Sequence, residues 1–343
     1  MTHIEETAIS AYPARLFMLQ NDDLRVVLTD IGARLLELWV PDRDGVPADV
    51  VLGRANLTEA ASDPHYMGST AGRYANRIRR GKFTLDGRAC QLTLNEGDNH
   101  LHGGRIGFDQ RAWSATAETD AVTFQLVSAD GEEGYPGTLH ATARYALAGR
   151  RLEITLTATT DRPTIVNLVN HAYLNLAGHD SGSVLGHIAQ IYADHYTPVD
   201  DELVPTGEIR SVADTPFDFR TPKRIEAGMA QVENGAAGRG VAGYDHNWVL
   251  NGSGVRRVAR FEDRTSGRAV DLSTNQPGLQ FYAGGYLAGV SAKGGGSYAS
   301  FAGFTLETQT FPDSVNHPHF PSPVLRPGET YANNVALDFS WDG

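Results

Sequence analysis

The segment FTLETQTFPDSVNHPHFP carries a carboxylate, Glu307, in a stretch that is otherwise uncharged up to Pro312. Glu307 is the only charged side chain between Gly294 and Pro312. Burying a lone carboxylate costs several kcal/mol unless hydrogen-bond donors or a cation offset it, so Glu307 either faces solvent or has a function. The alternation of Phe304 and Leu306 with polar residues predicts a strand that ends near a Pro-Asp turn. Because strand ends at loops are common places for sites, Glu307 is a candidate functional residue.

A second segment, PTIVNLVNHAYLNLAGH, has no Asp, Glu, Lys or Arg, yet it carries Asn167, Asn170, His171 and Asn175 among apolar residues. Buried polar side chains are retained when they are hydrogen-bonded. One interpretation is an amide lattice that fixes the His171 imidazole and its tautomer. The other is a satisfied core histidine, and this segment alone leaves the two equally open.

The segment NEGDNHLHGG offers the residue types of a metal site. His100 and His102 are two positions apart, so their side chains point to the same side if the backbone is extended. Such a pair could chelate a metal, as in a cupin. The Glu that usually follows the second His in a cupin is absent here, because Gly103, Gly104 and Arg105 follow instead. We therefore expect no metal.

Two further segments carry polar groups that suit a small-molecule site. GRYANRIRRGKF is basic in an otherwise acidic protein. It is either a solvated hairpin or a place where Asn76 and Arg77 set a guanidinium fork beside a substrate hydroxyl or a catalytic carboxylate. GYDHNWVL adds Asp245 as an acceptor and Trp248 as an aromatic face, a combination found in sugar sites.

The elements that must position these residues are mostly strands. RLEITLTAT alternates Leu152, Ile154 and Leu156 with polar residues, which is typical of a half-buried strand. Similar short runs recur between Asp-Gly and Asn-Gly turns. Only residues 222–232 have the pattern of a short helix. Many short strands with frequent turns favour an all-β sandwich, and no repeat or change of composition divides residues 1–343, so we expect a single domain.

Composition and charge exclude several classes of function. The 343 residues include 29 Lys plus Arg and 41 Asp plus Glu, and the net charge of −12 opposes binding to a nucleic acid backbone. The first twenty residues lack the basic start and apolar core of a secretion signal, and no run reaches the length of a membrane span. We therefore expect a cytoplasmic protein. Its single cysteine, Cys90, permits no internal disulfide.

Taken together, eight segments resemble the aldose 1-epimerase (galactose mutarotase) family, in the same order and over nearly the whole chain. The segments are GRYANRI, NHLHGG, VNLVNHAYLNLAG, YTPVDDELVPTGEI, PFDFR, GYDHNWVL, QPGLQFYAG and LETQTFPDSVNHPHFP. One such segment would be weak evidence, but eight in sequence are specific. The resemblance implies the large β-sandwich of galactose mutarotases.

The resemblance also implies a catalytic pair and a binding set. Glu307 in LETQ matches the general base, and His171 in the NHxYxNL motif matches the general acid. The residues expected to hold sugar hydroxyls are Asn76, Arg77, His102, Asp245 and Gln280. The implied reaction interconverts the α and β anomers of free aldohexoses such as galactose and glucose, and it needs neither a cofactor nor a metal.

Several properties stay open at this stage. A non-catalytic sugar-binding module on the same fold is the alternative, but such a module has no reason to retain both Glu307 and His171. Leu174, Tyr74 and Gly285 depart from residues common in the family, which leaves the preferred sugar open. The protein is expected to be a monomer or a homodimer.

Overall fold

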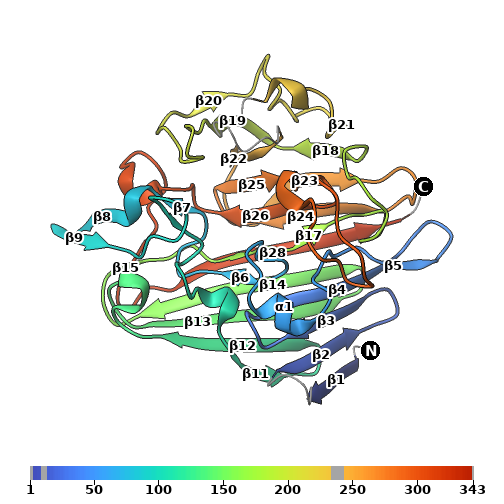
Figure 1. Ribbon diagram of the computed structural model, residues 1–343, viewed down its shortest axis with the longest axis horizontal. Helices are drawn as coiled ribbons and strands as arrows, with labels where there is room; N and C mark the ends of the chain where they lie inside the picture. Colours follow the sequence, from blue (N-terminus) through green and yellow to red (C-terminus); the bar gives the residue numbers. More distant parts are fainter. Residues whose placement is uncertain (1–2, 9–13, 233–242, 342–343) are drawn as a thin grey trace.

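The structure is a computed structural model, and it describes residues 3–8, 14–232 and 243–341. Three antiparallel sheets dominate it (Figure 1). The largest sheet has nine strands, in the spatial order β11 (Ser114–Ala117), β12 (Ala121–Ser128), β13 (Leu139–Ala148), β14 (Arg151–Thr160), β28 (Tyr331–Ser340), β24 (Ala269–Thr274), β23 (Arg256–Glu262), β18 (Ile188–Ile191) and β21 (Lys223–Arg224).

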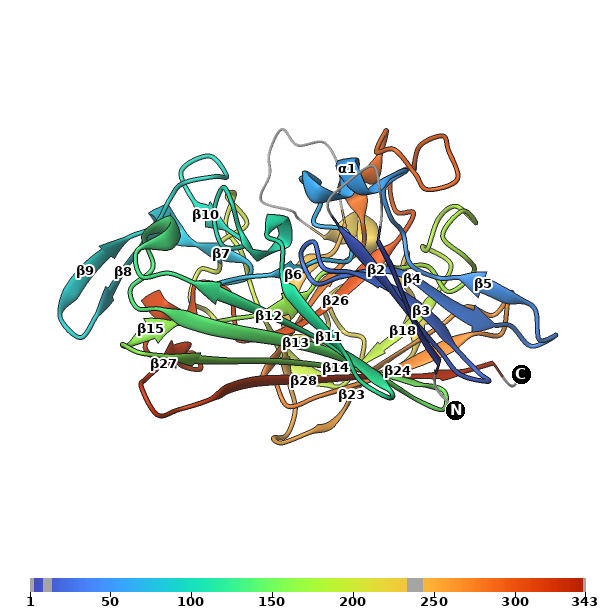
Figure 2. The ribbon, with the colours of Figure 1, turned by 90° about the horizontal axis from the view of Figure 1, so that it is seen from below.

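The other two large sheets lie on the opposite side of a shared core from the nine-stranded sheet. The six-stranded sheet has the order β17 (Tyr173–Leu174), β26 (Phe304–Gln309), β25 (Gly278–Tyr282), β22 (Asp245–Leu250), β19 (Ala193–Thr197) and β20 (Arg210–Ser211). The five-stranded sheet follows the chain as β1 (His3–Ala8), β2 (Arg15–Gln20), β3 (Arg25–Thr29), β4 (Arg34–Pro41) and β5 (Pro47–Asp49). Figure 2 shows β2, β3 and β4 over one side of the long strands β12, β13 and β14.

Short elements complete the chain. Four two-stranded ladders join β7 (Arg77–Ile78) to β10 (His100–Leu101), β6 (Thr70–Ala71) to β16 (Val169–Asn170), β8 (Lys82–Leu85) to β9 (Arg88–Gln91), and β15 (Thr164–Ile165) to β27 (Val324–Leu325). The helical segments are α1 (Leu57–Ala61) and the 3₁₀ turns η1 (Arg79–Gly81), η2 (Phe108–Gln110), η3 (Glu132–Gly134), η4 (Met229–Gln231), η5 (Gly285–Leu287) and η6 (Ser314–Asn316). Among the described residues, no helix has the length and apolar character needed to cross a membrane.

The hydrophobic core explains why the sheets stack. Along β14 the predicted residues Leu152, Ile154 and Leu156 are buried, because a period of two sends alternate side chains to one face. Aromatic rings join the layers. Phe17 of β2 meets Phe124 of β12 at 5.6 Å between ring centroids, and Phe261 of β23 stacks on Phe304 of β26 at 4.8 Å. These contacts confirm the expected all-β fold.

The helix expected over residues 222–232 does not form. The first part of this segment forms the edge strand β21, which pairs with β18, and the last part forms the 3₁₀ turn η4. Gly228, between them, adopts a left-handed backbone with φ of 83°, which a continuous right-handed helix excludes. The apolar periodicity was a weak signal there, and sheet pairing overrides it.

Candidate active site

The antiparallel register of the six-stranded sheet gathers polar residues from three strands. Glu307 on β26 lies directly opposite Gln280 on β25, and Gln280 in turn lies opposite Asn247 on β22. Directly opposed residues point to the same face, so the three side chains form a row across the sheet. Asp245 follows on the same face of β22, and its Oδ1 accepts a 2.7 Å hydrogen bond from Nε2 of Gln280.

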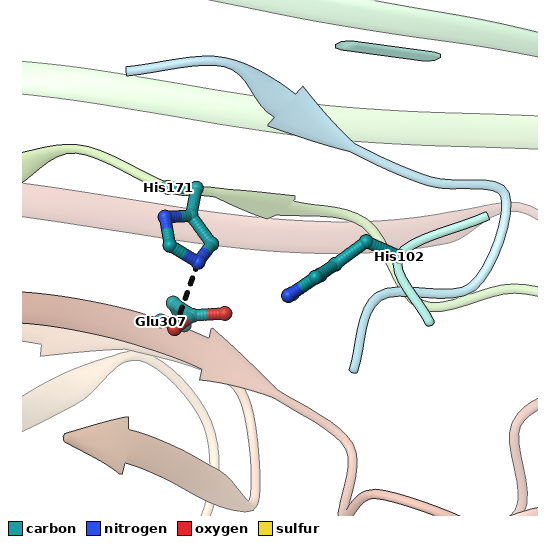
Figure 3. A group of neighbouring side chains, drawn as sticks. All are labelled: His102, His171 and Glu307. Carbon is teal, nitrogen blue, oxygen red and sulfur yellow. Dashed lines mark ion pairs between the residues drawn. The ribbon is translucent and has the colours of Figure 1, made fainter. Parts of the chain in front are cut away.

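The pairing of β17 with β26 in the same sheet places His171. Tyr173 on β17 pairs with Thr305 on β26, so continuing the antiparallel register brings position 171 opposite Glu307. Nε2 of His171 lies 3.5 Å from Oε1 of Glu307 (Figure 3). Both residues are buried, with exposed fractions of 5% and 2%. The alternation in β26 therefore sends Phe304 into the core and Glu307 into the site, and the solvent-facing interpretation of Glu307 is wrong.

The ladder of β7 and β10 contributes Asn76, Arg77 and His102. Arg77 pairs with Leu101, and the backbone beyond this pair turns sharply, since φ is 63° at Asn76 and 48° at His102. Few residues other than glycine take such angles, and they often do so at functional sites. The turn brings Nδ1 of His102 within 3.2 Å of the Asn76 backbone nitrogen, which donates to it.

His100 and His102 do not act as a pair. His100 turns away from the site, with its ring nitrogens 2.6 Å from the Thr93 carbonyl oxygen and 2.6 Å from the Tyr135 hydroxyl. His102 lies beside His171 instead, at 5.1 Å between ring centroids. The prediction that the two side chains share a side is wrong because β10 ends at Leu101 and the next residue has a left-handed backbone.

Arg77 is held in a fork by a carboxylate that the sequence did not suggest. Its Nε and Nη2 each donate a 2.7 Å hydrogen bond to one oxygen of Glu96. The bidentate geometry fixes the guanidinium plane, and the pKa of Arg77 is raised despite burial, which alone would lower it, because Glu96, Asp245 and Glu307 surround the charge. Arg77 is buried, so the solvated-hairpin interpretation is wrong for this residue, and its fork is bound to Glu96.

Burial controls the protonation of the central pair. It raises the pKa of Glu307 from 4.5 to about 8, an effect that Asp245 adds to and that the Thr305 hydroxyl and Arg77 oppose. Burial lowers the pKa of His171 from 6.5 to about 4, against the pull of Asp63 and Asp245. At neutral pH the pair therefore holds one proton, on the carboxyl group, and carries no net charge.

The sequence suggested no complete His-His-Glu set, but the structure assembles one from distant residues. One ligand atom from each of His102, His171 and Glu307 lies within 4.8 Å of the others. The hydrogen bonding of His102 does not suit a metal, however. Its Nδ1 accepts from Asn76, so the neutral ring carries its proton on Nε2, and an Nε2–H donates to a ligand oxygen rather than coordinating an ion.

The asparagines around His171 fit neither of the two interpretations left open, the amide lattice and the satisfied core histidine. The side chains of Asn167, Asn170 and Asn175 bond mainly to backbone groups, including Ala75, Gly68 and Ala302. Nδ1 of His171 is buried without a hydrogen-bond partner within the described part of the chain. The amides therefore fix the chain on both sides of His171, and they do not fix its imidazole.

Aromatic residues around the pair also differ from the prediction. Trp248 is fully buried and donates to the Phe217 carbonyl, so it belongs to the core and offers no face to a ligand. Tyr66 and Tyr173 pack against His171 instead, at 5.8 and 5.2 Å between ring centroids. Tyr66 also lies 4.5 Å from the His102 ring. No sequence signal marked Tyr66, because SDPHYMG has the composition of an ordinary turn.

The geometry thus gathers the seven predicted site residues on one face of the six-stranded sheet, beside the β7–β10 ladder. Six of the seven are buried, and Asp245 is half-buried. A carboxyl and an imidazole that share one proton can exchange protons with a ligand at two positions. The surrounding amide, guanidinium and carboxylate groups suit a small ligand rich in hydroxyls. The all-β sandwich and this site together indicate an enzyme that acts on sugars by acid–base catalysis.

Comparison with known proteins agrees with this class. The family model described as aldose 1-epimerase matches residues 15–338, so the chain belongs to the aldose 1-epimerase family. Galactose mutarotase of Bos taurus is 44% identical over 326 residues, covering 94% of this chain and 93% of the relative. Aldose 1-epimerase of Escherichia coli is 40% identical over 334 residues, covering 95% of each chain.

Solved structures extend the likeness to the fold. An aldose epimerase homologue from C. elegans superposes with a TM-score of 0.86 at 31% identity, covering 99% of both chains. A galactose 1-epimerase from Lactobacillus acidophilus superposes with a TM-score of 0.83 at 30% identity, covering 99% of this chain and 98% of the other. These relatives are named as epimerases or their homologues, and they give no support to a non-catalytic sugar-binding module.

Proposed function

We propose that the protein is an aldose 1-epimerase that interconverts the α and β anomers of free aldohexoses such as galactose and glucose. The observation that carries the proposal is the buried pair of Glu307 and His171, whose Oε1 and Nε2 lie 3.5 Å apart. Family membership supports the reaction, and this geometry supports the roles of the two residues.

Glu307 acts as the general base and His171 as the general acid. The reactive arrangement has a carboxylate and an imidazolium, and it contains the same single proton as the neutral pair of the free protein. Moving that proton from Glu307 to His171 therefore prepares the site without exchange with solvent. A bound sugar favours this move because its hydroxyls can donate to Oε2 of Glu307, which is buried without a partner among the described residues.

Ring opening then follows by two proton transfers. Glu307 takes the proton from the C1 hydroxyl while His171 donates a proton to the ring oxygen, and the bond between C1 and the ring oxygen breaks to leave an aldehyde. Rotation about the C1–C2 bond presents the other face of the carbonyl. In the closing step the ring hydroxyl attacks C1, His171 recovers its proton, and Glu307 returns one to O1. The net change in protons is zero.

The remaining polar groups hold the sugar. Nε2–H of His102 and the free donors of the Arg77 fork supply hydrogen bonds, and Asn76, Asp245 and Gln280 supply both donors and acceptors. Asp245 is linked to Gln280, so the two act as one polar edge of the site. The Asp245 carboxylate disfavours an anionic sugar by like-charge repulsion, which favours a free aldose over a sugar phosphate.

The direct test is polarimetry of freshly dissolved α-anomers of glucose, galactose, xylose and arabinose, with and without the protein. We expect the approach to the anomeric equilibrium to accelerate, and the ranking of the four sugars to define the preference. Equal rates with and without protein for all four sugars would refute the proposed activity. A cytoplasmic location and a monomeric or homodimeric state belong to the same proposal and are tested by fractionation and by sedimentation.

A further inference from the structure

Among the described residues, the His171 ring lacks the second hydrogen bond that would fix its rotation. Catalytic histidines are commonly oriented by a hydrogen bond from the second ring nitrogen to a carbonyl or carboxylate. In the described part of the chain, Nδ1 of His171 has no such partner, and Nε2 faces Glu307 at 3.5 Å. The orientation of the ring must therefore come from its packing, which involves His102, Tyr66 and Tyr173.

Tyr66 is held in an unusual backbone conformation. Its φ is 58°, in the left-handed region that bulky side chains rarely enter. Residues persist there when the surrounding structure fixes them, and such residues cluster at functional sites. The conformation directs the ring of Tyr66 toward His102 and His171, at 4.5 and 5.8 Å between ring centroids.

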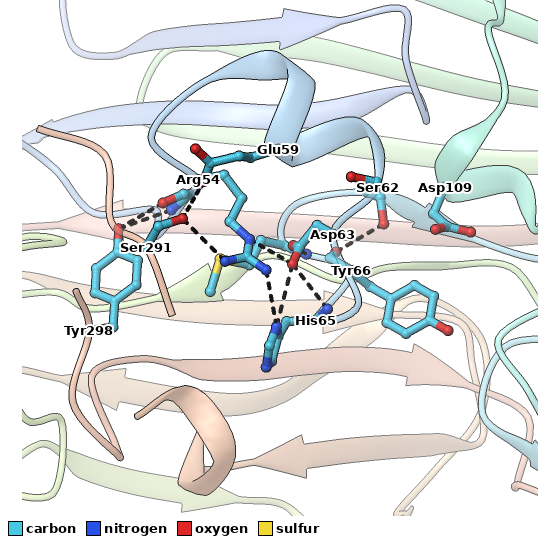
Figure 4. A network of polar contacts seen from close by, with 12 residues as sticks. Arg54, Glu59, Ser62, Asp63, His65, Tyr66, Asp109, Ser291 and Tyr298 are labelled. Carbon is cyan, nitrogen blue, oxygen red and sulfur yellow. Dashed lines mark hydrogen bonds and ion pairs between the residues drawn. The ribbon is translucent and has the colours of Figure 1, made fainter. Parts of the chain in front are cut away.

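Asp63 organises the turn that carries Tyr66 (Figure 4). Its side chain is fully buried, and its two oxygens accept hydrogen bonds from the backbone nitrogens of His65 and Met67, at 3.1 and 2.8 Å. These residues flank Tyr66 on both sides. Nε of Arg54 donates a 2.8 Å hydrogen bond to the same carboxylate. The turn is thus built around a buried ion pair.

The ion pair is tied to the segment that contains Ser291. Nη1 of Arg54 donates to the hydroxyl of Ser291 at 3.3 Å, and that hydroxyl in turn donates to the carboxylate of Glu59 on α1. Figure 4 shows Arg54 between Asp63 and Ser291, with Tyr66 extending away from the ion pair. The Arg54 guanidinium therefore links the turn around Asp63 to Ser291.

The turn is also joined to the backbone of His171 itself. The Ser69 backbone nitrogen donates to the Tyr66 carbonyl at 3.0 Å, and the His171 nitrogen donates to the Ser69 carbonyl at 2.8 Å. The Gly68 nitrogen donates to the His171 carbonyl at 2.9 Å. A displacement of the turn would therefore be transmitted to both the backbone and the ring of His171.

We propose that Tyr66 is a positioning residue, whose ring, held by the turn around Asp63, fixes the ring planes of His171 and His102. The proposal rests on the proposed roles of these histidines as acid and sugar-binding group. The hydroxyl of Tyr66 has no part in it, because the contacts to both imidazoles are made by the ring. A misoriented acid lowers the rate even when every catalytic group is present.

The test compares Tyr66→Phe, which keeps the ring, with Tyr66→Leu, which removes it. Tyr192→Leu is the control, because Tyr192 is also half-buried and packs under the Arg257 guanidinium, away from the histidines. Each variant is measured for kcat and KM by polarimetry, for melting temperature, and for the chemical shifts of its histidine ring protons and nitrogens. Because the loss of the Tyr66 ring current shifts these signals by itself, ring orientation is judged by whether His171 keeps its proton–proton contacts with Tyr173, a readout that does not depend on activity.

We expect Tyr66→Leu to lower kcat/KM by about 10- to 100-fold and to weaken the proton–proton contacts between His171 and Tyr173. The kcat/KM of Tyr66→Phe should stay within about threefold of the wild-type value, and its histidine signals should not move. The control variant Tyr192→Leu should behave in the same way. The proposal is overturned if Tyr66→Leu keeps the wild-type rate, or if Tyr66→Phe loses as much as Tyr66→Leu. It is also overturned if Tyr66→Leu is slow while His171 keeps its contacts with Tyr173, since the ring would then contact the sugar.

A second variant tests the support of the ring. Asp63→Asn keeps the size of the side chain and removes its charge, which weakens both the Arg54 pair and the hydrogen bonds of the turn. The histidine signals should move in this variant although Tyr66 is intact, and unmoved signals would contradict the role of Asp63. A wild-type protein without mutarotase activity would refute the proposed function alone, because the ring signals would still test the placement of Tyr66.

Discussion

Replacing Glu307 with Gln should stabilise the protein while it removes the base. A carboxyl whose pKa is raised from 4.5 to about 8 in the folded state ionises more easily when the chain unfolds. Its contribution to stability is complete below pH 4.5 and is lost as the pH rises toward 8. The Gln side chain has a similar shape, and it cannot ionise in either state. The gain from Glu307→Gln should therefore grow with pH.

The size of the gain in stability follows from the shift in the pKa of Glu307. Each pKa unit corresponds to about 1.4 kcal/mol, so the gain should be close to zero at pH 4, about 3 kcal/mol at pH 7, and about 5 kcal/mol above pH 8. At roughly 2 °C per kcal/mol for a chain of this size, the melting temperature at pH 7 should rise by about 6 °C. Trading stability for a functional group in this way is common at active sites.

The assay is thermal unfolding of wild type and variant between pH 4 and 9, followed by circular dichroism or calorimetry. Glu153→Gln is the matched control, because its side chain on β14 is 43% exposed and does not share the burial of Glu307. The difference in melting temperature between Glu153→Gln and wild type should not increase with pH. A Glu307→Gln variant that melts with wild type at pH 8, or below it, would refute the argument that burial keeps Glu307 protonated in the free protein.

Three further predictions concern activity. The pH profile of kcat/KM should be bell-shaped, falling below about pH 4, where a second proton reaches the pair, and above about pH 8, where the shared proton is lost; a flat profile would mean that another pair acts. Asp245→Ala should raise KM by the equivalent of roughly 1 to 3 kcal/mol, because a charge-assisted hydrogen bond is lost, and an unchanged KM would place Asp245 outside the sugar site. Activity should survive exhaustive dialysis against EDTA, since every catalytic role is assigned to a side chain; loss of rate restored by zinc would contradict that assignment.

Local patterns in the sequence predicted the strands well. A period of two describes how a strand divides its side chains between two faces, and it held for β14 and for the separation of Phe304 from Glu307 on β26. The same reasoning failed at His100 and His102, because one left-handed residue reverses the direction of a side chain. Such a conformation at a residue other than glycine leaves little trace in the sequence.

The site was predicted by resemblance more than by pattern. Distances such as the one between His171 and Glu307 depend on which strands pair, and pairing between β17 and β26 joins residues 130 positions apart in a way that periodicity does not specify. Glu96 and Tyr66 were missed for the same reason, since their partners lie on other segments. That residues 1–343 form one domain stays a prediction.

The measurement that tests the account most directly is one polarimeter comparison. Freshly dissolved α-galactose is followed with wild-type protein, Glu307→Gln, His171→Asn and the double variant. Each single variant should lose about 10²- to 10⁴-fold in catalysis, and the double variant should be scarcely slower than either, because acid and base act as a unit. A Glu307→Gln protein that mutarotates galactose at close to the wild-type rate would contradict the mechanism.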